Sequence, residues 1–174
     1  MQKAIIIIIL FSELLFTGCK KDSNQTNPPA TPPAFQSYIK FKVDNVPVEC
    51  NAQISASYLP LIPDTSIWIA GASNIADIRL QVSGNQQLLT TGTYTFNSAK
   101  WHSGTIWTKS PGAVRYVAGM DLFLRNYSGS GYVTITEISA QYVKGTFEFI
   151  TGIDIPTNTF KTVTNGEFYV KRNN

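Results

Sequence analysis

Charged side chains are scarce in this sequence of 174 residues. Lysine, arginine, aspartate and glutamate together make up 14% of it, whereas about 25% is usual for a soluble globular protein. The formal net charge is only +3, and the basic residues are scattered along the chain. Nucleic-acid-binding proteins instead gather them in a patch or stripe. We therefore expect no nucleic-acid partner.

Side chains that bind metals or act as nucleophiles are equally rare. His102 is the only histidine, and Cys19 and Cys50 are the only cysteines. A zinc site needs three or four histidine, cysteine or carboxylate ligands, and a Ser-His-Asp or Cys-His site would depend on His102, which lies in no recognised motif. Cys50 is better explained as a small buried apolar residue. The sequence thus predicts no metal, no cofactor and no catalytic residue, and favours a protein that is not an enzyme.

No apolar run is long enough for a membrane-spanning helix, which needs about 18 residues or more. The run Ala4–Phe11, which follows the positive charge of Lys3, has the size of a signal-peptide core. Leu15-Phe16-Thr17-Gly18-Cys19 then resembles the lipobox of bacterial lipoproteins. That resemblance implies a signal peptide of residues 1–18, cleavage between Gly18 and Cys19, diacylglycerol on the Cys19 thiol, and an acyl chain such as palmitate on the new amine.

Residues 19–34 form a proline-rich linker behind this cysteine. Lys20–Ala34 has no apolar periodicity, and its four prolines oppose both helix and sheet. As polyproline II these 15 residues would reach roughly 45 Å. Lys20 follows the lipid-bearing residue, which by resemblance to Gram-negative sorting rules favours the outer membrane of the cell envelope over the inner one. The face of that membrane stays open.

Residues 35–174 show alternating apolar and polar positions, bounded by turn residues, and no convincing helical pattern. This pattern predicts an all-β domain, an antiparallel β-sandwich or flattened barrel of roughly eight to ten strands, which we expect to be a monomer. Asp44-Asn45 is expected to turn the chain, Gly129–Gly131 to form a hairpin turn, and Gly92, Gly145 and Gly166 each to open a strand. The clearest alternation covers residues 39–43, 48–56, 76–82 and 115–125.

Several strand motifs in this domain resemble a group of small Bacteroidota lipoproteins of unknown function. These motifs are YVTITEIS from Tyr132, YVKGTFEF from Tyr142, VTNGEFYVK from Val163 and the opening FKVDNVPVEC from Phe41. The resemblance implies a β-sandwich behind a lipid anchor, and it assigns no catalytic residue.

The polar segment 97–113 contains the candidate binding residues Trp101, His102 and Trp107. Aromatic rings among hydrogen-bonding groups suit a sugar face or a peptide. Both tryptophans could instead cap the end of the core, and we favour this second interpretation. Our first hypothesis is a lipid-anchored envelope protein that binds a partner or has a structural role. The second is an accessory glycan-binding lipoprotein that uses Trp101 and Trp107. The third is a small hydrolase, because two carboxylates suffice for glycoside hydrolysis.

Overall fold

The computed structural model describes residues 35–58, 65–84, 87–96, 101–109, 112–121 and 126–173. The chain divides into two compact units, residues 1–34 and 35–174. The predicted signal peptide and linker, with Gly18 and Cys19, lie outside the described residues, so the account below concerns the second unit. No helix in the described ranges is long and apolar enough to cross a membrane.

The described part of the chain is built from strands. In order they are β1 (Tyr38–Val43), β2 (Val46–Glu49), β3 (Ala52–Tyr58), β4 (Ser66–Ala72), β5 (Ala76–Ser83), β6 (Gly92–Thr95), β7 (Ser103–Thr108), β8 (Val114–Asp121), β9 (Asn126–Ser128), β10 (Ser130–Ile138), β11 (Tyr142–Ile150) and β12 (Thr162–Asn173). The prediction of an all-β domain is therefore confirmed.

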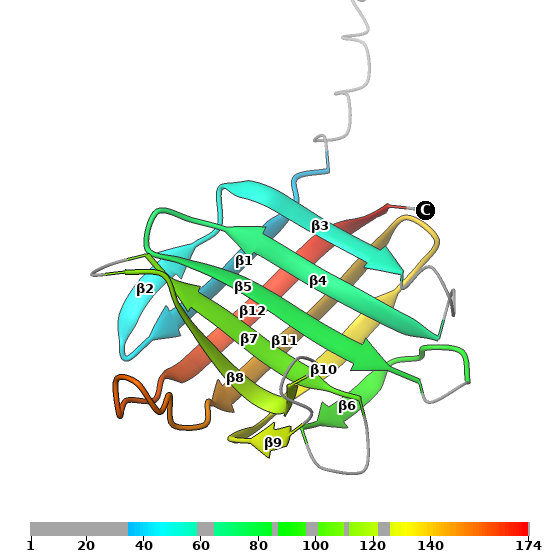
Figure 1. Cartoon of the computed structure of the whole chain (residues 1–174). Coiled ribbons are helices and arrows are strands. Elements are labelled where there is room, and N and C mark those ends of the chain that lie inside the picture. Colours follow the sequence, from blue (N-terminus) through cyan, green and yellow to red (C-terminus); the bar gives the residue numbers. More distant parts are fainter. Residues whose placement is uncertain are drawn as a thin grey trace, which may run out of the picture. The chain divides into compact units, whose positions relative to one another are not determined.

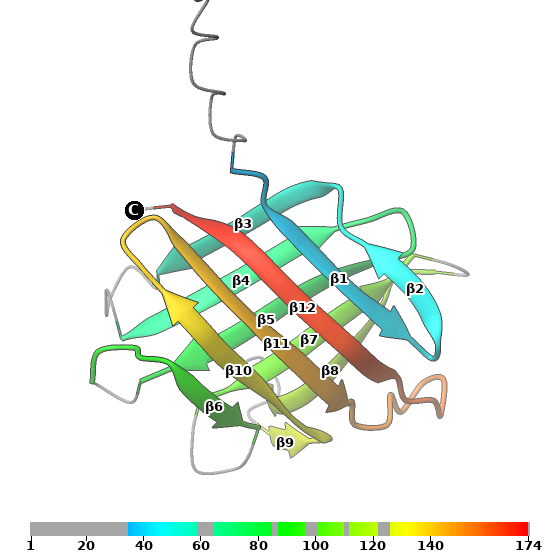
Figure 2. The same cartoon turned by 180° about the vertical axis from the view of Figure 1, so that it is seen from behind.

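These strands form one continuous sheet rather than two separate ones. Its order is β6-β10-β11-β12-β3-β4-β5-β7-β8-β9, with the β1–β2 hairpin attached to β12. The pairs are antiparallel except for a short parallel contact between β12 and β3, where Arg172 lies opposite Ala56. The sheet curls so that its two halves face each other, as Figures 1 and 2 show from opposite sides. The predicted eight to ten strands match the ten of this path, and the hairpin adds two.

The core lies between the two halves and follows the predicted alternation. Ile39, Phe41 and Val43 of β1 are buried, as are all the inward residues of β5, namely Ala76, Ile78, Leu80 and Val82. Burying an aliphatic or aromatic side chain of this size stabilises the fold by roughly 1.5–3 kcal/mol. The domain therefore has a substantial core of its own.

The predicted strand 48–56 is wrong, because the chain turns a corner within it. β2 ends at Glu49 and β3 begins at Ala52. The Cys50 N–H donates to Ile39 O in one half of the sheet, whereas the Asn51 N–H donates to Ala72 O in the other. Gln53 then takes a positive φ of 51°. The chain thus crosses between the halves at Cys50, which is buried between them.

Gly129 marks a second crossing and not the predicted hairpin turn. The strands on either side of it do not pair with each other, because β9 pairs with β8 while β10 pairs with β6 and β11. The φ of Gly129 is 65°, a conformation that glycine adopts without steric cost.

The turn at Asp44 and Asn45 is confirmed. Val43 pairs with Val46 across a two-residue connection, and Asp44 and Asn45 have φ values of 49° and 69°. Positive φ at both central residues is the requirement of the hairpin turn whose twist matches that of its strands. Asparagine and aspartate tolerate this conformation better than other non-glycine residues.

Two of the three motif glycines lie inside strands instead of opening them. Gly92 does begin β6, but Gly145 and Gly166 fall within β11 and β12. In the register of these strands Gly145 lies opposite Phe168, and Phe147 lies opposite Gly166. Each phenylalanine ring covers the glycine across from it. The repeated Gly-x-Phe pattern is therefore a reciprocal packing device between neighbouring strands.

Candidate functional site

His102 lies in the interior rather than on a binding surface. Its side chain is 1% exposed. The Ser83 N–H donates to its Nδ1 at 3.1 Å, and its ring meets the Tyr94 ring edge to face, with centroids 5.3 Å apart. These contacts give His102 a packing role between the start of β7 and the end of β5.

The structure does not bring Trp101 and Trp107 together. Trp101 precedes β7 and is 53% exposed, whereas Trp107 is half-buried near the far end of that strand. Six residues of extended chain span roughly 20 Å. The two rings therefore cannot form one sugar-binding surface, although each remains partly accessible.

A different set of residues surrounds Trp107 on the outward face of the sheet. Arg79 of β5 lies between two indole rings, with its Cζ 5.0 Å from the centroid of Trp68 and 5.1 Å from that of Trp107. Such spacing is within the range of cation–π attraction. We call Trp68, Arg79 and Trp107 the tryptophan–arginine ladder.

Strand register explains why these three side chains meet. Arg79 lies opposite Ala70 on β4 and Thr105 on β7. Trp68 and Trp107 are each two residues from those partners, so both are diagonal neighbours of Arg79 on the same face. Long and aromatic side chains reach one another across such diagonals.

A second guanidinium extends this surface. Arg115 of β8 lies directly opposite Trp107. Burial, together with the nearby positive charge of Arg115, lowers the pKa of Arg79 from its ordinary value. Two guanidinium groups, Arg79 in the ladder and Arg115 beside it, therefore lie near the same indole ring.

Beside the ladder the surface forms a shallow depression of about 340 Å³. Arg79, Trp107, Asp77 and Gln53 line it, together with small residues of β4 such as Ala70 and Ala72. Lys109 Nζ lies 2.7 Å from Asp77 Oδ2, so the one carboxylate lining this depression is paired. The hollow is therefore lined by one indole, one guanidinium, one amide and one carboxylate paired with a lysine.

The family described as Domain of unknown function (DUF6252) matches residues 51–170. The chain belongs to this family. No curated protein and no solved structure matches the chain. The matched range contains the whole ladder and Arg115, whereas β1 and β2 precede it although they complete the core of the DUF6252 domain.

Most acidic side chains of the described residues have structural partners. No group of three or more histidine, cysteine or acidic residues that could hold a metal occurs among the described residues. The partners are Lys161 for Asp44, Lys40 for Glu49, Lys109 for Asp77, Tyr142 for Glu137, Tyr132 for Glu148 and Thr157 for Asp154.

Cys50 of the DUF6252 domain is buried, and its thiol is unreactive. Burial, followed by the negative charges of Asp77 and Glu49, raises the pKa of its thiol to about 12. Because the thiolate is the reactive form of cysteine, the thiol is inert near neutral pH. Its interpretation as a small apolar core residue is confirmed by its burial.

The sequence pattern around Trp68 and Arg79 is the one that could have indicated the ladder. Trp68 stands between buried Ile67 and Ile69, and Arg79 stands between buried Ile78 and Leu80. A tryptophan and an arginine on the outward positions of two consecutive strands can lie side by side. Only the pairing of β4 with β5, and of β5 with β7, shows that they do.

Proposed function

We propose that this chain is a lipid-anchored protein of the cell envelope that acts by binding and not by catalysis. In this proposal Cys19 carries the lipid, the linker 19–34 is the tether, and the β-sandwich-like domain presents its tryptophan–arginine ladder to an acidic glycan. The lipobox resemblance of Leu15–Cys19 supports the anchor, and Lys20 behind it supports the outer membrane.

The ladder is the observation that carries the binding role. Two half-buried indoles flank one guanidinium on the solvent side of the sheet, with a second guanidinium opposite Trp107. Both guanidinium groups stay charged near neutral pH and can donate hydrogen bonds to an anionic ligand beside the rings.

The chemistry of the ladder favours an acidic sugar polymer as the ligand. Indole rings pack against the apolar faces of sugar rings, and their polar edges tolerate water. Guanidinium groups form paired hydrogen bonds with carboxylate, sulfate or phosphate groups. A glycan that carries such groups meets both requirements at one surface, whereas a neutral glycan would use only the rings.

The ladder favours this binding role over the two other functions considered for the chain. The carboxylate-based hydrolase has no comparable support, because most acidic side chains of the described residues are held in ion pairs or hydrogen bonds. A glycan site shared by Trp101 and Trp107 is replaced by the ladder, in which Trp107 takes part and Trp101 does not.

A direct test compares an acidic with a neutral polysaccharide. The domain 35–174 is titrated calorimetrically with polygalacturonate and with a neutral galactan at low and at physiological salt. We expect the acidic polymer to bind more tightly, with an affinity that falls as salt rises, because salt screens exposed charges. Trp107→Ala should weaken binding by about tenfold or more, the scale of losing one buried aromatic contact.

Trp101→Ala is the matched control, since it removes an exposed indole just before β7, the strand that carries Trp107. It should leave the affinity for polygalacturonate unchanged. Equal binding of the two polymers, or an equal loss in the two tryptophan variants, would contradict the proposed site.

A further inference from the structure

The loop between β11 and β12, residues 151–161, exposes three large apolar side chains. Ile153 is 63% exposed, Ile155 90% and Phe160 52%. Scattered single apolar residues are normal on a protein surface, but a contiguous group indicates an interaction site. We call these three residues the apolar tip.

The polar and the apolar residues of the loop have different surroundings. Asp154 pairs with Thr159 in an isolated antiparallel bridge, and the side chains of both make hydrogen bonds within the protein. Ile153, Ile155 and Phe160 are instead exposed to solvent.

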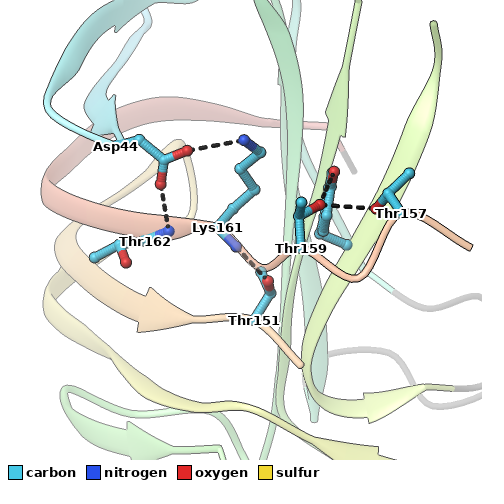
Figure 3. Close-up of polar contacts among 7 residues, drawn as sticks. Asp44, Thr151, Thr157, Thr159, Lys161 and Thr162 are labelled. Atoms are coloured by element: carbon cyan, nitrogen blue, oxygen red, sulfur yellow. Dashed lines mark hydrogen bonds and ion pairs between the residues drawn. The ribbon is translucent and has the colours of Figure 1, made fainter. Parts of the chain in front are cut away.

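Hydrogen bonds hold the polar residues of the loop in place, among them the one between Thr157 and Thr159 that Figure 3 shows. Asp154 Oδ2 accepts from Thr157 N at 3.0 Å and from Thr157 Oγ1 at 2.6 Å. Thr159 Oγ1 shares a hydrogen bond of 2.9 Å with the hydroxyl of Tyr116 on β8. Asn158 takes a positive φ of 52° and completes the tight turn.

The base of the loop is fixed as well. The Lys161 N–H donates to Thr151 Oγ1 at 2.8 Å, and Lys161 Nζ donates to Asp44 Oδ2 at 2.8 Å. The Gly152 N–H donates to Val117 O on β8, and this contact accompanies the burial of Val117. A loop held at its base and by its own polar residues loses little conformational entropy when its exposed apolar side chains bind a target.

We propose that the apolar tip inserts into the interfacial region of a lipid bilayer. This inference rests on the proposed lipid anchor, which brings the domain to a membrane. Of the residues 151–160, only Asp154 is charged, and its carboxylate accepts two hydrogen bonds from Thr157 within the loop. Large apolar side chains such as isoleucine and phenylalanine are the residue types that enter the boundary between headgroups and acyl chains.

The length of the chain before the domain allows this contact. β1 begins at Tyr38, which lies opposite Tyr169 of β12, so roughly 23 Å of strand separate the start of β1 from the loop before Thr162. Both views of the fold show the loop at the end of β12 away from the start of β1 (Figures 1 and 2). The 15 residues of Lys20–Ala34 reach about 45 Å when extended. An anchor at Cys19 and the apolar tip can therefore engage the same bilayer.

The experiment places an environment-sensitive dye on the tip of the lipidated chain. Ile155→Cys supplies the labelling site, and Cys50 stays unlabelled because it is buried with a raised pKa of about 12. The protein is reconstituted in vesicles of phosphatidylethanolamine and phosphatidylglycerol. Leu88→Cys is the matched control, because Leu88 is 72% exposed on a different loop.

We expect a blue-shifted emission and quenching by lipid-borne spin labels for the dye at position 155, and neither for the dye at position 88. Removing residues 21–33 leaves two linker residues, which reach roughly 6 Å, and should abolish the shift. In the unlipidated domain 35–174, Ile153→Ser with Ile155→Ser should lower vesicle binding by about tenfold without changing the melting temperature.

Aqueous emission at both positions in vesicle-bound protein would overturn the inference. A shift without lipid that grows with protein concentration would also overturn it, and would assign the tip to contact with a second copy. If no variant is retained on vesicles, the proposal of a lipid anchor at Cys19 is wrong. The labelled domain 35–174, added to the same vesicles, then decides the role of the tip by itself.

Discussion

Gly145 and Gly166 show how single residues set the packing of this domain. Each lies opposite a phenylalanine of the neighbouring strand, in the reciprocal pairs Gly145–Phe168 and Phe147–Gly166. A Cβ on Gly145 would lie 2.6 Å from Phe168 Cζ and would also meet the Thr134 carbonyl oxygen. Because glycine has no side chain, the rings of Phe168 and Phe147 can pack over Gly145 and Gly166.

Gly145→Ala should therefore destabilise the domain by roughly 1–3 kcal/mol, the usual cost of overpacking a well-filled core. The measurement is the free energy of unfolding in urea. Gly112→Ala is the control, because a Cβ there would meet nothing within 4 Å, and it should be nearly neutral. Equal stability of the two variants would show that the rings can move aside at little cost.

At the scale of elements, the β1–β2 turn is joined to the start of β12 by charge. Asp44 accepts from Lys161 Nζ at 2.8 Å and from the Thr162 N–H at 2.9 Å. Burial by itself would raise the pKa of Asp44, but these hydrogen bonds and the charge of Lys161 outweigh it and lower the pKa. The hydrogen bond to Asp44 in turn raises the pKa of Lys161.

The stabilisation from this pair should be confined to a pH window. A lowered carboxyl pKa stabilises the fold above about 3.8 and is lost as pH falls through the folded value. A raised lysine pKa stabilises it below about 10.5 and is lost as pH rises beyond. A double-mutant cycle of Asp44→Asn and Lys161→Met should give a coupling of about 0–1 kcal/mol at pH 7, because the pair is exposed.

The same cycle should give a coupling that disappears as pH falls through the lowered pKa of Asp44, because protonation removes the negative charge. A coupling that stays unchanged while Asp44 becomes protonated, followed by its carboxyl NMR signal, would mean that the two residues interact through packing rather than charge.

The elements also show where prediction from the sequence succeeds. Period-2 alternation placed β1 and β5 correctly, and the Asp44-Asn45 turn followed from the two residue types. The corner at Cys50 was not predictable, because inward positions on both sides of it keep the same alternation. Its cause is the pair of hydrogen-bond acceptors Ile39 O and Ala72 O, which sequence periodicity does not reveal.

The sequence did not predict the correct set of site residues, for a related reason. Trp101 and Trp107 are close in the sequence, but an extended strand carries them apart. Trp68 and Trp107 are distant in the sequence, but sheet pairing places both beside Arg79. Composition and spacing can indicate that an aromatic binding site exists, whereas the strand order determines which aromatic side chains form it.

At the scale of the whole molecule, the proposed anchor makes a simple prediction. Cys19→Ala removes the only thiol in the lipobox, so the precursor should stay uncut and should carry no lipid. Detergent phase separation and the apparent mass of the protein check both effects. Normal cleavage of the variant, with unchanged partitioning into the detergent phase, would contradict the lipoprotein assignment.

The most direct measurement of the binding account uses the three tryptophans of the chain. Each indole N–H gives its own signal in a nitrogen–proton correlation spectrum, and the signals can be assigned by single substitution. During titration with polygalacturonate, the account predicts that the Trp68 and Trp107 signals shift together while Trp101 stays in place. A shift of Trp101 alone, or saturated binding that leaves both ladder indoles unmoved, would contradict it.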